Sequence, residues 1–66
     1  MVTNSIASNA QLIVDLLTLT GDFPLRQLKV RSGLSDVDFY MSVGWLFREG
    51  TLFCYYKEGV GLMAGL

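Results

Sequence analysis

The sequence predicts a mainly α-helical fold that ends in a β-hairpin, and two observations lead to this prediction. Through residues 5–49, apolar residues recur at spacings of three and four, as in helices that pack on one face. Residues 51–57 are then rich in β-forming types, and Glu58-Gly59 separates them from an alternating segment at 60–66. We therefore expect three helices followed by two strands.

The first helix is expected over residues 5–19, with Asn4 or Ser5 as its N-cap. Helical spacing relates the apolar residues Ile6, Ala10, Ile13 and Leu17. Asp15 is the one charged residue of this segment. A helix with so few charges is expected to contact protein on more than one side.

The second helix is expected over residues 24–32, after a turn at Gly21-Asp22. Pro24 suits the first turn of a helix, where its missing N–H group costs nothing. Gly33 follows the last residue and is expected to close the helix in a left-handed conformation.

The third helix is expected over residues 35–49. Ser35 is its predicted N-cap, and Asp38 three positions later completes a variant of the capping box. Gly50 is the predicted stop. The inward stripe of this helix is Phe39, Ser42, Val43 and Leu46. The expected core joins it to the other helices through Ile13, Leu25, Leu28, Phe39, Val43 and Leu46.

Three helices and a C-terminal hairpin, in this order, make a minimal three-helix winged helix-turn-helix. The charges, however, disagree with sequence-specific DNA recognition. The net charge is −1, whereas nucleic-acid modules usually carry a basic excess. The third helix offers one cation against three acids, and the two first-turn acids complement the positive end of the helix. The candidate phosphate contacts are Arg26, Lys29, Arg31 and Arg48. The alternative for the three cations of the second helix is an ordinary solvated face.

Large apolar side chains exceed what a chain of 66 residues can hide. The candidate interface residues are Tyr40, Met41, Trp45, Phe53, Tyr55 and Met63. The alternative is that Tyr40 and Trp45 only cover the edge of a small core. Gly44, in the middle of a helix, is explained by the close approach of another backbone, or by packing against the chain's own hairpin.

The sequence contains few residues that could act in catalysis or bind a metal ion or cofactor. It contains no histidine and a single cysteine, Cys54, so we expect no catalytic residues, no metal site, no cofactor and no internal disulfide. Cys54 is expected to be a small buried apolar residue. The glycine-rich segment 59–65 lacks a lysine and a following helix, which excludes a phosphate-binding loop. We expect one domain over residues 1–66, a cytoplasmic location, and neither a membrane partner nor a small-molecule substrate.

A family resemblance is carried by Phe39-Tyr40 and by the segment Gly-Trp-Leu-Phe-Arg-Glu-Gly at 44–50. The chain resembles the small stand-alone winged helix-turn-helix domain proteins of unknown function, over essentially its whole length. In that family the segment is similar to Gly-Trp-Leu-Ala-Arg-Glu-Gly followed by lysine, where this chain has Phe47 and Thr51. The resemblance implies the fold and a DNA-binding-like character, with no defined activity. The missing lysine removes a positive charge near the hairpin.

Two functions therefore compete. The first is a transcription-regulator-like, nucleic-acid-associated domain whose binding to double-stranded DNA is at most weak and non-specific. The second is a protein–protein interaction or homodimerisation module without DNA binding. The fold and the basic second helix favour the first, whereas the charge balance and the excess of aromatic residues favour the second.

Overall fold

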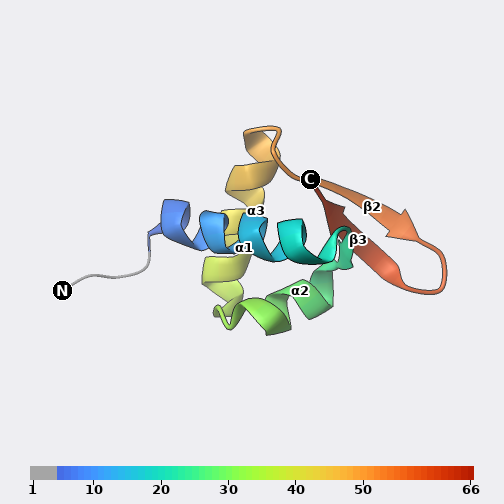
Figure 1. Ribbon diagram of the computed structural model, residues 1–66. Helices are drawn as coiled ribbons and strands as arrows, with labels where there is room; N and C mark the ends of the chain where they lie inside the picture. Colours follow the sequence, from blue (N-terminus) through green and yellow to red (C-terminus); the bar gives the residue numbers. More distant parts are fainter. Residues whose placement is uncertain (1–4) are drawn as a thin grey trace.

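The computed structural model describes residues 5–66 and confirms the predicted order of three helices and a C-terminal hairpin. The helices pack into one body, and the hairpin extends from one end of it (Figure 1). The elements are α1 (Ile6–Thr20), β1 (Phe23–Pro24), α2 (Leu25–Ser32), α3 (Asp36–Arg48), β2 (Phe53–Lys57) and β3 (Gly61–Gly65).

The helix ends follow local signals in the sequence. The Ser5 hydroxyl accepts a hydrogen bond from the Ser8 N–H at 3.0 Å, whereas Asn4 lies outside the described residues. The Ser35 hydroxyl accepts from the Asp38 N–H at 3.1 Å, which is one half of the predicted capping box. Gly33 has a φ of 71°, as expected for a left-handed C-cap.

The sheet contains a strand that the sequence did not predict. Its order is β1-β3-β2, and both pairings are antiparallel. Phe23 pairs with Ala64 and Pro24 pairs with Met63, so β1 is a two-residue edge strand and Pro24 precedes α2 instead of opening it. Two residues are too short to show an alternating pattern, and an edge strand tolerates proline because no ladder hydrogen bond is needed on its outer side.

The hairpin turns at the predicted place with a longer loop than expected. Lys57 pairs with Gly61, so the loop has three residues where a two-residue turn was predicted. The Val60 N–H donates to the Lys57 carbonyl at 3.0 Å, and Gly59 has a φ of 86°. Because Glu58 keeps a negative φ, this is the pattern of a type II turn, which requires glycine at its third position.

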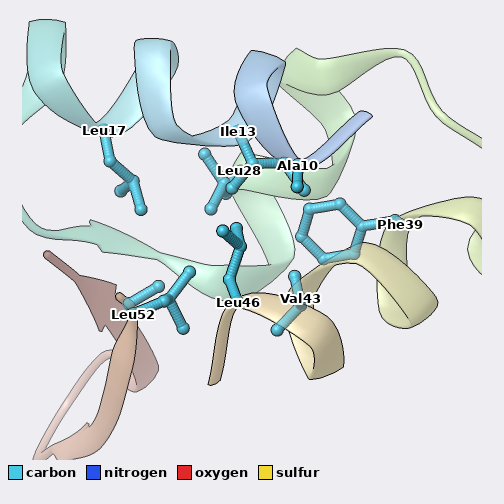
Figure 2. Packing of buried hydrophobic residues seen from close by; sticks show 9 residues of the cluster. Ala10, Ile13, Leu17, Leu28, Phe39, Val43, Leu46 and Leu52 are labelled. Atoms are coloured by element: carbon cyan, nitrogen blue, oxygen red, sulfur yellow. The ribbon is translucent and has the colours of Figure 1, made fainter. Parts of the chain in front are cut away.

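The core lies between the three helices and the inner side of the sheet. Side chains of α1 and α3 meet at its centre, Leu28 of α2 lies behind them, and Leu52 closes the end beside the hairpin (Figure 2). Leu25 is only half-buried, because it opens α2 beside a surface cleft. The buried hydrophobic cluster is Ala10, Ile13, Leu17, Leu28, Phe39, Val43, Leu46, Leu52 and Ala64.

Candidate interaction surface on helix α3

Helix α3 has two apolar faces, of which the fold covers one. The four residues of its predicted inward stripe are all buried. At about 100° per residue, the residues directly opposite are Val37, Met41, Gly44 and Arg48, at spacings of four, three and four. Tyr40 and Trp45 flank this line on its two sides. The solvent side of α3 therefore carries a seam with the 3.5-residue period typical of paired helices.

The seam is open to solvent. Val37 is 66% exposed, and Tyr40 and Met41 are each 51% exposed. Phe47 and Trp45 extend the apolar surface toward the C-terminal end of the helix. Phe47 and Val37 were not among the predicted interface residues, although the 4-3-4 spacing that places Val37 on this face was visible in the sequence.

Gly44 lies in the middle of the seam. Among the described residues, no neighbouring atom lies within 4 Å of a Cβ atom added at this position. The chain's own hairpin therefore does not explain this glycine, which contradicts one of the two explanations left open by the sequence. The other explanation, the approach of a second backbone, is compatible with this open position.

The candidate phosphate contacts do not form one basic patch. Lys29 is half-buried, and its ammonium group pairs with the Asp36 carboxylate at 2.6 Å. The Arg31 guanidinium lies 5.1 Å from the centroid of the Phe23 ring. Arg26 and Arg48 are exposed and form no ion pair within residues 5–66. Two of the four cations are thus held by contacts inside the chain.

The two remaining arginines lie in different places. Arg26 lines a surface cleft of about 390 Å³, together with Tyr40 of α3 and the hairpin residues Val60, Gly61 and Leu62. Arg48 is in the last turn of α3, and the 13 residues of that helix span about 20 Å at 1.5 Å per residue. The structure therefore places Arg26 in the same cleft as Tyr40 and leaves Arg48 at the C-terminal end of the seam.

The aromatic residues of the hairpin have partners within the chain. The rings of Phe53 and Tyr55 stack with their centroids 5.6 Å apart, and the Tyr55 hydroxyl donates to the Asp22 carboxylate at 2.7 Å. This hydrogen bond, helped by desolvation and by the Asp22 charge, raises the pKa of Tyr55. The sequence did not reveal Asp22 as a partner, because 33 positions separate the two residues.

Two sequence-predicted residues of the hairpin are less accessible than their neighbours. Met63 was a candidate interface residue, but it is only 6% exposed because β3 is the central strand, so it is not part of an exposed surface. Cys54 is half-buried and packs against the core. Burial raises the pKa of the Cys54 thiol, which favours the unreactive protonated form.

Comparison with known proteins agrees with this fold. Neither the curated proteins nor the solved structures gave a match. No helix in the described part of the chain is long and apolar enough to cross a membrane. The family model for a winged helix-turn-helix domain (DUF2582) matches residues 1–64. The chain therefore belongs to the winged helix-turn-helix domain family DUF2582.

Proposed function

We propose that this protein is a non-enzymatic interaction module that forms a homodimer through the outward face of α3. The observation that carries the proposal is the exposed apolar seam of that helix, with Gly44 open at its middle. Contiguous exposed apolar surface rich in aromatic residues and methionine is typical of protein contacts. A winged-helix fold by itself is compatible with either partner, protein or nucleic acid.

The side chains on this face favour protein over base recognition. A helix that reads the major groove uses Arg, Lys, Asn or Gln to contact base edges. The seam of α3 offers Val37, Met41 and Gly44 there, and a single cation, Arg48. Asp36 and Asp38 occupy the first turn, where they would face phosphate groups unfavourably.

The available area limits the strength of the proposed dimer. A fully buried aromatic side chain removes roughly 150–250 Å² from water, so the partly exposed side chains of this face offer on the order of 500 Å². A standard interface buries about 800 Å² on each partner. We therefore expect dissociation in the micromolar range or above.

Sedimentation of the protein across micromolar to millimolar concentrations tests the proposal. Met41→Lys places a charge in the seam and is expected to shift the protein to monomer. The matched control is Leu19→Lys, which changes an apolar residue that is 84% exposed on α1, and it is expected to leave the dimer intact. A wild-type protein that stays monomeric throughout, or equal effects of both variants, would contradict a dimer through α3.

Weak binding to double-stranded DNA is the second candidate, and the exposed Arg26 and Arg48 favour it. So few phosphate contacts predict a shallow salt dependence, weak affinity and no sequence preference. Replacing Arg26 with Gln should weaken binding equally for duplexes of any sequence, as measured by fluorescence anisotropy at low salt. Base-specific binding at physiological salt would contradict this candidate.

We place the protein in the cytoplasm, as one domain over residues 1–66. A single cysteine in thiol form suits a reducing compartment. The described helices and strands surround one hydrophobic cluster, which supports a single folding unit. Limited proteolysis tests the second point, since a single unit should yield no stable internal fragment.

A further inference from the structure

We infer that the two copies pair α3 against α3 in antiparallel orientation, about a two-fold axis that passes between Met41 and Gly44. The inference rests on the proposed homodimer and adds the orientation and register of its contact. Two features of the face lead to it: the positions of its large and small residues, and the positions of its charges.

The seam is self-complementary when the second helix runs in the opposite direction. With the axis midway between positions 41 and 44, Met41 lies opposite the partner's Gly44, and Val37 lies opposite the partner's Arg48. A methionine side chain then enters the notch that a missing Cβ leaves, as in the packing of side chains into the gaps of a facing helix. Within residues 5–66, no atom from another part of the fold fills this notch.

The charges of α3 distinguish the two orientations. Asp36 and Asp38 are in the first turn, and Arg48 is in the last turn. Asp36 is paired with Lys29 of the same chain, so Asp38 is the first-turn acid that forms no ion pair within residues 5–66. An antiparallel pair places Arg48 of each copy beside the first turn of the other, where Asp38 flanks the seam on the same side as Trp45. A parallel pair would place Arg48 beside the partner's Arg48 and acids beside acids. Opposed helix dipoles favour the antiparallel arrangement as well.

The same charge pattern favours a second copy over other occupants of the face. A duplex would bring phosphates to the acidic first turn, which repels them. An unrelated partner helix would need an apolar seam of matching spacing. It would also need a basic residue facing the acidic first turn of α3 and an acidic residue facing Arg48. A second copy in antiparallel orientation meets both conditions through symmetry alone.

Reversing the charges tests the orientation. Arg48→Glu and Asp38→Arg, made separately, each bring like charges together in the antiparallel pair. Each is expected to raise the dimer dissociation constant about tenfold, which corresponds to the loss of one modest interaction between opposite charges. The double variant restores opposite charges across the interface, so its dissociation constant should return toward that of the wild type.

Sedimentation equilibrium measures the dissociation constants, and circular dichroism checks that each variant is folded. Asp15→Lys on α1 is the control, because it makes a comparable charge change away from α3 and should not alter the dimer. Loss of the dimer in Met41→Lys without restoration in the double variant would overturn the antiparallel pairing and leave the homodimer standing. A wild-type monomer at all concentrations would overturn both.

Discussion

The inward and outward faces of α3 are both largely apolar, but their surroundings differ completely. Phe39 and Ser42 on the inward face are fully buried, and Val43 and Leu46 join them in the core. On the outward face, Val37, Tyr40 and Met41 are at least half exposed. The fold accounts for the residue types of the first face. On the second face it gives Tyr40 an edge-to-face contact with Phe39 and leaves the exposed Val37 and Met41 unexplained.

Because the two faces differ in exposure, variants on them can separate effects on the stability of the monomer from effects on association. A residue on the inward face stabilises the monomer, so replacing it should act on unfolding at any concentration. A residue on the outward face adds little to the monomer, so replacing it should act mainly through association, which depends on concentration. Variants on the two faces therefore test whether the inward face serves folding and the outward face serves association.

Phe39→Ala is expected to have the largest effect. The Phe39 ring is fully buried, and its removal leaves a cavity among α1, α2 and α3. The expected loss is about 3–5 kcal/mol in the free energy of unfolding, which is enough to unfold many small domains. Thermal unfolding at low protein concentration measures it. Met41→Ala should change the melting temperature little under the same conditions, and an equal loss would mean that the outward face also stabilises the monomer.

Two glycines should respond to alanine in opposite directions. At Gly65 a Cβ atom would collide with the ends of the Asp22 and Phe53 side chains, both of which are exposed and can shift, so Gly65→Ala should destabilise the fold by about 1 kcal/mol. At Gly44 there is open space within a helix, so Gly44→Ala should stabilise the monomer by up to about 1 kcal/mol. Urea unfolding at low concentration gives both values.

The effect of Gly44→Ala on dimerisation is a second test of this position. Gly44→Ala fills the notch opposite the partner's Met41, and we expect a weaker dimer from a more stable monomer. Sedimentation at high concentration measures the dimer. An alanine that raises stability and leaves association unchanged would separate Gly44 from the proposed interface.

The Lys29–Asp36 ion pair should contribute less than either glycine. It joins α2 to α3, but the Asp36 side chain is 77% exposed, so water and salt screen the attraction. Lys29→Met is expected to cost no more than about 1 kcal/mol, and less at high salt. Chemical unfolding at low and high ionic strength checks this. A larger, salt-independent loss would show that the lysine stem contributes by packing.

The smallest effect should be a pH dependence at the hairpin. The hydrogen bond to Asp22 raises the pKa of Tyr55 above its ordinary value of about 10. The contribution of this hydrogen bond to stability is therefore complete below the ordinary tyrosine pKa, and it is lost as the pH rises through the pKa of Tyr55 in the folded protein. Ultraviolet titration should show a late tyrosinate signal that disappears in Tyr55→Phe and moves to lower pH in Asp22→Asn. An unchanged titration in Asp22→Asn would contradict this assignment.

Local signals in the sequence determined the helices and the hairpin. Ser35 caps α3 through a group three residues away, Gly33 ends α2 by its own backbone conformation, and Gly59 forms its own turn. The stripe of α3 likewise follows from the helical period alone. Because these features depend on near neighbours in the chain, the winged helix-turn-helix order was predictable from residue types and spacing.

Packing between the elements determines which side chains find partners within the chain. It added β1 to the sheet, buried Met63 in the central strand, and engaged Lys29 and Arg31 with partners on other elements. It also left Gly44 open. These outcomes depend on contacts between different helices and strands, which the spacing pattern within one element does not encode. The periodicity of α3 shows that it has two apolar faces, and only packing shows which of them remains for a partner.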